Sequence, residues 1–444
     1  MTQLADKIED MTMSEGPAWF EDFRAAGREQ HERVGFPAAN DERWRFTNIG
    51  PVTKTQFGIA EAASGGDMFD HYTFGKDAGV ELVFVNGFYS PELSKIETLP
   101  KGLSVNTLAD AASNGHADII RQHLGKQADL TQHPFVAINT AHLRDGAFIH
   151  LKRSTTVEAP IHLLFISIGS DQPVASHPRV LVVAEDNVEA TIVESYVGEG
   201  KQYLCNAVTE VICGQDCRID HCKLQMESVD SYHTAVMQVE IGKHTQFVSH
   251  AISIGAKISR NDLGVKLAGQ ASYATLNGLV LLSGSQHCDN HTMLDHASPD
   301  CPSHELYKHV LSEKSSAVFK GQILVRQIAQ RTNAKQSSKS LLLSDTASMN
   351  SMPALEIYAD DVKCTHGSTI GPIDDELVFY LRSRGVGFEA ARHLLTYAFA
   401  ADVTRRIKVV PVRRRVEDFM ARQHGLPQDL RINDLGAFDE AVIR

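Results

Sequence analysis

Two short stretches of the sequence concentrate side chains that can bind a metal ion. The first is Cys364-Thr365-His366, in which a thiol and an imidazole stand two positions apart. On a β-strand such residues point to one face, about 6–7 Å from each other. A tetrahedral metal site needs three or four ligands, so this pair is half of one and needs ligands from a neighbouring turn or another chain. The residues alone fit two packed interior side chains equally well.

The second stretch runs from His287 to His304. Its potential ligands are His287, Cys288, Asp289, His291, Asp295, His296, Cys301 and His304. Imidazole and thiolate bind zinc or iron, so a stand-alone metalloenzyme could be built on this cluster. Its spacing is irregular, however, and lacks the paired short intervals of a structural zinc motif. We therefore favour polar side chains that bond to one another inside a β-structure, and keep the metalloenzyme as the alternative function.

The sequence patterns of common enzyme classes are missing. No Gly-Lys pair precedes Ser or Thr, as a phosphate-binding loop requires, and there is no Gly-x-Ser-x-Gly, Gly-x-Gly-x-x-Gly or His-Glu-x-x-His pattern. The chain is accordingly not expected to hydrolyse ATP or to be an enzyme.

Composition narrows the class of protein further. The 444 residues carry a formal net charge of −12, which argues against nucleic acid as a partner. The first residues do not resemble a signal peptide, and no apolar run approaches the ~18 residues that a membrane-spanning helix needs. Seven cysteines, an odd number, fit a compartment where thiols stay reduced. These features predict a cytoplasmic protein that does not enter a membrane.

The central part of the chain, residues 145–371, consists of short β-branched runs separated by polar turns. Four of these turns recur about 26 to 29 residues apart, a spacing typical of solenoids. They are 184–187, 213–216, 241–244 and 267–270, and later turns are spaced more widely. The recurring pattern of strand, turn and strand favours a parallel β-helix over a closed sandwich.

Helical patterns flank this region. Residues 1–144 are predicted to hold an amphipathic helix through Trp19, Phe20, Phe23 and Ala26, a strand over 81–87 and a helical stretch near 109–124. Residues 372–444 are predicted to form a helical region that starts at the acidic run 374–376. The expected fold is therefore mainly β, with helical regions at both ends.

A long block near the second helical region resembles the SufB/SufD family of iron-sulfur cluster assembly proteins. It is more similar to SufD than to SufB. The block runs from Leu355 to Gly371 and continues through 374–376 and 379–385. Shorter matches lie at 42–47, 139–141, 145–146, 295–296 and 305–308, so that the likeness extends over about residues 35 to 425. His309 departs from the pattern, since the family often has Gly there.

The resemblance implies a right-handed parallel β-helix that acts as a scaffold and not as an enzyme. It implies pairing with a SufB-like paralogue through the β-helix edges and docking of a SufC-like ABC-type ATPase on the C-terminal helical region. ATP would be bound by that partner only, and iron or a transient iron-sulfur cluster would form at the SufB–SufD interface. Whether the isolated chain forms a homodimer stays open.

The resemblance also implies roles for particular residues. His366 matches a histidine that faces a cysteine of SufB in the family, and Cys364 matches the cysteine beside it. Both are therefore candidate ligands of iron or of a nascent cluster. The candidate residues for docking the ATPase are Leu377, Tyr380, Leu381, Leu394, Leu395 and Phe399.

Overall fold

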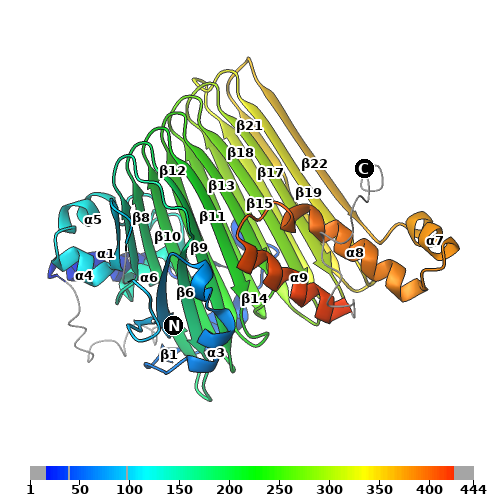
Figure 1. Ribbon diagram of the computed structural model, residues 1–444, viewed down its shortest axis with the longest axis horizontal. Coiled ribbons are helices and arrows are strands. Elements are labelled where there is room, and N and C mark those ends of the chain that lie inside the picture. Colours follow the sequence, from blue (N-terminus) through cyan, green and yellow to red (C-terminus); the bar gives the residue numbers. More distant parts are fainter. Residues whose placement is uncertain (1–16, 39–40, 97–98, 425–444) are drawn as a thin grey trace.

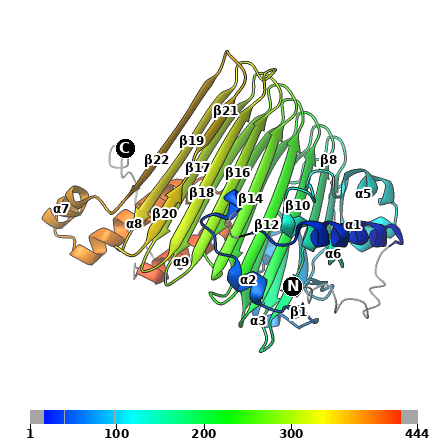
Figure 2. The same cartoon turned by 180° about the vertical axis from the view of Figure 1, so that it is seen from behind.

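A parallel β-solenoid forms the body of the molecule in this computed structural model, which describes residues 17–38, 41–96 and 99–424. Two long sheets face each other across an interior lumen, and helices lie at both ends of the chain (Figures 1 and 2). The expectation of a mainly β fold with a parallel solenoid core is confirmed. No helix in the described ranges is both long and apolar enough to cross a membrane.

Sheet A and sheet B are each built from alternate strands of the chain. Along sheet A the order is β4 (Leu103–Thr107), β5 (Ala147–Leu151), β8 (Arg179–Ala184), β10 (Tyr203–Cys213), β12 (Tyr232–Ile241), β14 (Ile258–Leu267), β16 (His287–His296), β18 (Ser316–Val325) and β20 (Ser348–Ser351), with β7 (Val174–Ser176) beside β10, β1 (Gly58–Ile59) beside β7 and β21 (Ala354–Ile357) beside β18. Along sheet B it is β3 (Phe88–Tyr89), β2 (Val80–Val85), β6 (Ile161–Ile168), β9 (Glu189–Glu199), β11 (Arg218–Met226), β13 (Gln246–Ser253), β15 (Tyr273–Leu282), β17 (Pro302–Leu311), β19 (Asn333–Leu342) and β22 (Lys363–Gly371).

The register between strands confirms the repeat that the turns indicated. Tyr232 pairs with Ile258 and Ile258 with His287, which are offsets of 26 and 29 residues. At three of the four predicted turns one residue adopts a left-handed backbone conformation: Asn187, Asp216 and His244. Consecutive turns are closely stacked: a Cβ added at Gly242 would lie 2.4 Å from the carbonyl oxygen of Gly214. Glycine at that position lets consecutive turns lie directly on one another.

Side chains alternate between the lumen and the two outer faces, as strand geometry requires. The lumen holds the largest apolar cluster, with aromatic rings such as Phe165, Tyr196 and Phe247. Polar side chains share the lumen with them, and their positions decide what the interior can do chemically.

The N-terminal region packs on the first strands and on the outer face of sheet A. Its helices are α1 (Trp19–Val34), α2 (Gly50–Lys54), α3 (Gly66–Tyr72), α4 (Leu108–Ser113), α5 (Ala117–His123) and α6 (Pro134–Ala141), with short 3₁₀ turns at Glu42–Trp44 and Gly75–Asp77. The predicted N-terminal helix is confirmed, with Phe20 fully buried. The stretch near 109–124 forms two helices, because Gly115 takes φ +86° between them. Since β2 and β4 extend the two sheets, the boundary placed at residue 144 does not separate the sheets.

Three C-terminal helices follow β22: α7 (Asp375–Ser383), α8 (Phe388–Thr404) and α9 (Val410–His424). The predicted acidic start of the first helix is confirmed, since the Asp374 carboxylate accepts a hydrogen bond from the amide of Glu376. Helices α8 and α9 lie against the outer face of sheet B, whereas α7 projects from the end of the solenoid (Figure 1).

Candidate functional site

Strand β22 ends sheet B and leaves one end of the solenoid open. One edge of β22 pairs with β19, and within the described residues its other edge pairs with no strand. Large apolar side chains are exposed nearby at Ile357, Tyr358 and Ile370. An open, partly apolar edge strand can pair with another chain. This end of the molecule therefore has the features of an interaction surface.

Cys364 and His366 lie on this last strand, on its inward face. They pair with Ala334 and Gln336 of β19, and Cys364 packs against the apolar cluster of the lumen. Burial raises the pKa of the Cys364 thiol above its usual value. The His366 side chain is exposed, because no strand lies beyond it. The structure thus presents an imidazole at the mouth of the lumen, with a thiol two positions away on the same face.

A column of polar side chains leads from the interior to His366. Glu305, Gln336 and His366 occupy matching positions on three successive strands of sheet B. Gln336 donates a hydrogen bond from Nε2 to Glu305 Oε2 at 2.7 Å, while its own Oε1 has no hydrogen-bond partner. Burial raises the pKa of Glu305 to about 7. The column could therefore hold or pass a proton close to the open end.

The pair at the open end is incomplete as a metal site. In the described part of the chain, three ligand atoms of His, Cys, Asp or Glu come within 4.8 Å of one another at a single place, which does not include Cys364 or His366. A cluster or metal ion held at the end of β22 would need further ligands from a second chain. The role of Cys364 and His366 as ligands stays a prediction.

The second predicted cluster is divided between the two faces of β16. Cys288 is fully buried on the lumen side, whereas His287, Asp289 and His291 face outward. His287 bonds to Ser316 and Thr47, and His296 bonds to Ser303 at 3.0 Å. These contacts agree with polar side chains that bond to one another within the fold, and the stretch does not gather into one ligand set.

The outward half of this cluster anchors the N-terminal segment. Arg260 donates to Asp289 at 2.8 Å and to the carbonyl oxygen of Arg43, and its guanidinium lies 3.9 Å from the ring centroid of Trp44. Burial alone would raise the pKa of Asp289, but the charge of Arg260 and the bonds from its neighbours hold it below its usual value. These contacts hold the run 42–47 against strands β14 and β16.

The six residues expected to dock an ATPase occupy different environments. Leu381, Leu395 and Phe399 pack in an apolar cluster formed by α7, α8 and strand β19. Leu377 and Leu394 are half-buried, while Tyr380 is exposed. Five of the six side chains are thus half-buried and Tyr380 is exposed, and their role in docking stays a prediction.

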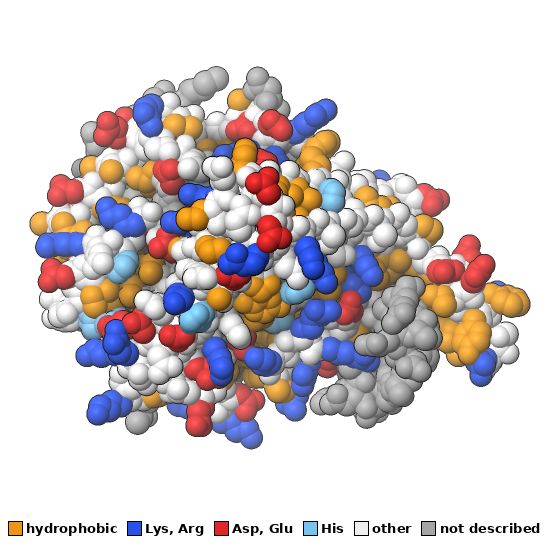
Figure 3. Space-filling model, turned by 90° about the horizontal axis from the view of Figure 1, so that it is seen from above, with side chains coloured by type: hydrophobic (Ala, Val, Ile, Leu, Met, Phe, Trp, Pro, Cys, Tyr) orange, Lys and Arg blue, Asp and Glu red, His pale blue; other side chains and the backbone are white. Residues whose placement is uncertain are grey.

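Two exposed aromatic residues near α7 were absent from that predicted set. Phe379 is 71% exposed and Phe388 is 47% exposed. Together with Tyr380 they form what we call the aromatic patch. Figure 3 shows hydrophobic side chains gathered on the projecting lobe that α7 forms at the right. The adjacent pair Phe379-Tyr380 was a usable signal, since Val378 and Leu381 already fill the inward positions of the helix.

Comparison with known proteins identifies the family. The model described as "SUF system FeS cluster assembly, SufBD core domain" matches residues 165–399, and the model for the SufBD protein N-terminal region matches residues 1–163. The chain belongs to the SufBD family. An iron-sulfur cluster assembly SufBD family protein of Synechocystis is 33% identical, over 86% of each chain. The iron-sulfur cluster assembly proteins SufD of Escherichia coli and Bacillus subtilis are 30% and 26% identical, over 86% and 92% of this chain and 88% and 94% of theirs.

Membership in the SufBD family confirms the resemblance seen in the sequence. The core model covers strands β7 to β22, helix α7 and most of α8, and the N-terminal model covers helices α1 to α6 and strands β1 to β5. The chain is therefore an iron-sulfur cluster assembly protein of the SufBD family with SufD homologues.

Proposed function

We propose that this chain is the SufD-type half of a two-chain scaffold on which iron-sulfur clusters are built. In this proposal β22 pairs with an edge strand of a SufB-like paralogue, and His366 faces that chain as a ligand or proton handler. Iron or the nascent cluster is cargo held between the two chains. The chain itself performs no turnover, and a SufC-like ABC-type ATPase supplies the energy.

The open end of the solenoid is the observation on which this proposal rests. It combines an unpaired strand edge, exposed apolar residues and the incomplete ligand pair Cys364 and His366. A paralogue with the same solenoid could continue the sheet and bring the missing ligands to the lumen mouth. Neutral imidazole binds iron, and its pKa lies close to physiological pH, so the same group can also handle protons.

The aromatic patch supports the second half of the proposal. Exposed aromatic residues are common anchors of protein interfaces, and here they project beyond the solenoid on α7 and the start of α8. Helix α8 is joined to sheet B by a buried ion pair between Lys308 and Asp402. Force applied at the patch would therefore reach β17, which is separated from β22 by one strand, β19.

The role of His366 is tested by reconstitution of the complex under anaerobic conditions. The tagged chain is first purified from its own cells, and we expect a SufB-like and a SufC-like protein to co-elute in fixed ratio. His366→Ala should leave that composition intact and reduce the iron and sulfide content of the complex. Thr365→Ala is the matched control, because Thr365 is exposed on the opposite face of the same strand. Normal cluster content in His366→Ala, or elution of the chain alone, would contradict the proposal.

The docking surface is tested with Phe379→Ser. A truncated interface aromatic costs about 2 kcal/mol at a hot spot, which is roughly 30-fold in Kd for the ATPase. Because Phe379 is mostly exposed, the stability of the free chain should change by less than about 0.5 kcal/mol. Val229→Ser, at an exposed apolar residue in a distant turn, should change neither quantity. Unaltered ATPase affinity in Phe379→Ser would remove α7 from the docking surface.

A further inference from the structure

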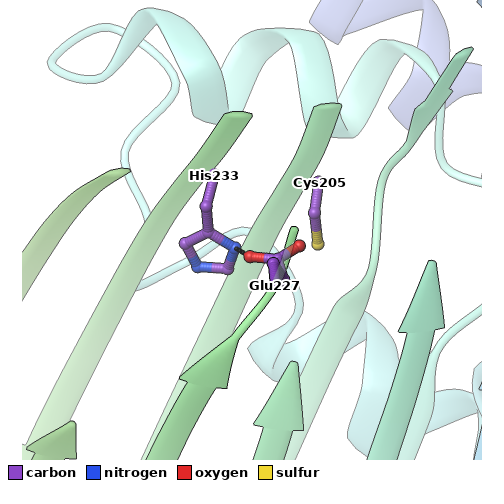
Figure 4. A group of neighbouring side chains, drawn as sticks. All are labelled: Cys205, Glu227 and His233. Atoms are coloured by element: carbon purple, nitrogen blue, oxygen red, sulfur yellow. Dashed lines mark ion pairs between the residues drawn. The ribbon is translucent and has the colours of Figure 1, made fainter. Parts of the chain in front are cut away.

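A second set of potential metal ligands lies buried inside the lumen, far along the chain from Cys364 and His366. Cys205 and His233 occupy paired positions on the neighbouring strands β10 and β12, and Glu227 follows the end of β11 on the opposite sheet. Figure 4 shows the three side chains pointing toward one another between the sheets. Their ligand atoms all lie within 4.8 Å of one another. The three residues are 0 to 5% exposed.

One buried polar atom in this cluster lacks a partner. Glu227 Oε1 is buried and accepts no hydrogen bond. The other carboxylate oxygen, Oε2, lies 2.8 Å from His233 Nδ1 in an ion pair. A bare carboxylate oxygen beside a buried thiol and an imidazole is what an empty coordination site would leave.

The surrounding side chains orient the ligands without occupying the space between them. Gln225 donates to Glu227 Oε2 at 3.0 Å, which leaves Oε1 free. Lys223 Nζ lies 2.8 Å from His233 Nε2, on the side of the ring away from Glu227, and it also bonds to Asn261. An ammonium can only donate, so His233 Nε2 accepts from Lys223 and the ring carries its proton on Nδ1. Binding of an ion through Nδ1 displaces this proton.

We infer that Cys205, Glu227 and His233 form a binding site for one divalent transition-metal ion, Fe²⁺ or Zn²⁺, inside the lumen of the single chain. The site goes beyond the proposed function, because it requires no partner and no residue of β22. Thiolate, imidazole and carboxylate together are a ligand set that suits these ions. Three protein ligands leave one position open for water or a transferable ligand.

The dimensions suit a four-coordinate ion. With bonds of about 2.0 Å to nitrogen or oxygen and about 2.3 Å to sulfur, tetrahedral ligand atoms stand roughly 3.3–3.7 Å apart. The Nδ1 atom of His233 and Oε2 of Glu227 lie 2.8 Å apart, and all three ligand atoms lie within 4.8 Å of one another, which is the range of these values. The thiolate and the carboxylate balance the charge of a divalent ion. The other charged groups nearby are Lys223 and Glu194.

The test uses Co²⁺ as a spectroscopic probe on the full-length chain, purified without partners, stripped with a chelator and kept anaerobic. We expect one Co²⁺ per chain, with a thiolate-to-cobalt charge-transfer band and the visible bands of four-coordinate cobalt. Competition with Zn²⁺ and with Fe²⁺ then separates the two candidate ions. Cys205→Ser should abolish the charge-transfer band. Glu227→Gln and His233→Gln should weaken binding at least 100-fold, since even outer-shell changes cost about 10- to 100-fold.

Two controls separate this site from the rest of the chain. Cys222→Ser removes a cysteine that is equally buried but packs under α8 and α9, and it should leave cobalt binding unchanged. The double variant Cys364→Ser/His366→Ala should also bind cobalt normally. Absence of cobalt binding, or a band that survives in Cys205→Ser but disappears in the double variant, would overturn the inference. A band that depends on Cys364 and His366 instead of Cys205 would still be compatible with the proposed function. If Cys205→Ser fails to fold, X-ray absorption of the wild-type cobalt protein decides: one sulfur ligand with nitrogen and oxygen supports the site, and no sulfur ligand refutes it.

Discussion

Lys308 joins the C-terminal helices to the solenoid, and its replacement by methionine should release them. Lys308 lies on β17 with its side chain 1% exposed, and its Nζ is 2.9 Å from Asp402 Oδ2. The same ammonium donates to the carbonyl oxygen of Phe399 at 2.9 Å and lies 4.5 Å from the centroid of the Phe399 ring. Burial alone would raise the pKa of Asp402, but the bonds from Lys308 and Arg406 hold it below its usual value. Three contacts of one cation therefore fix α8 on sheet B.

The size of the effect follows from what the substitution leaves behind. Removal of one partner from a fully buried ion pair costs about 3–5 kcal/mol. Asp402 is 31% exposed and keeps its bond to Arg406 at 3.0 Å, so its charge stays partly solvated. Methionine also preserves most of the apolar packing of the lysine stem. We therefore expect Lys308→Met to cost about 2–3 kcal/mol, most of it in the attachment of α8.

Hydrogen exchange of the amides in α8 and α9 measures this attachment locally. A loss of about 2–3 kcal/mol corresponds to roughly 30- to 150-fold faster exchange wherever opening of the helices limits it. Lys408→Met is the matched control, because the Lys408 side chain is 79% exposed and pairs with Asp220 at the surface. Exposed pairs contribute about 0–1 kcal/mol, so exchange should hardly change in the control. Equal exchange rates in the two variants would refute the idea that the buried pair holds α8.

Three further outcomes are expected. The pKa of Glu305 is raised from 4.5 to about 7 in the folded chain, so Glu305 costs stability progressively as pH rises from about 4.5 to 7. Glu305→Gln should therefore raise stability at pH 8 by up to about 3 kcal/mol and leave it unchanged at pH 4. Equal urea midpoints of the variant and the wild type at both pH values would contradict this. Gly255→Ala would place a Cβ 2.2 Å from the backbone of Glu227 and should lower the free energy of unfolding in urea by at least about 1–3 kcal/mol. In the control Gly367→Ala the new Cβ meets no atom within 4 Å, and the loss should be far smaller. Trp44→Ala should cost about 3–5 kcal/mol and free the N-terminal segment for proteolysis, and an unchanged cleavage rate would count against its anchoring role.

Much of the fold could be predicted because its signals are local. The turns at 213–216 and 241–244 recur at the offset that the strand register then confirms, since each turn needs small or polar residues wherever the chain reverses. The acidic start at Asp374 likewise marks a helix, because its carboxylate caps an amide two residues away. The placement of Cys364 and His366 on one face followed from the alternation of side chains along a single strand.

The sequence by itself determined the family, the repeating β architecture and the placement of Cys364 and His366 on one face of the last strand. Tertiary structure decided the surroundings of the predicted docking residues. Phe399, for example, is half-buried beside Lys308 of β17, a contact that no helical period can show. Tertiary structure also decided the meeting of Cys205, Glu227 and His233, which come from two strands and a turn. Alternation along a strand is local, whereas register across the lumen depends on how every preceding turn of the solenoid is stacked. A site that spans the lumen is visible only once that stacking is known.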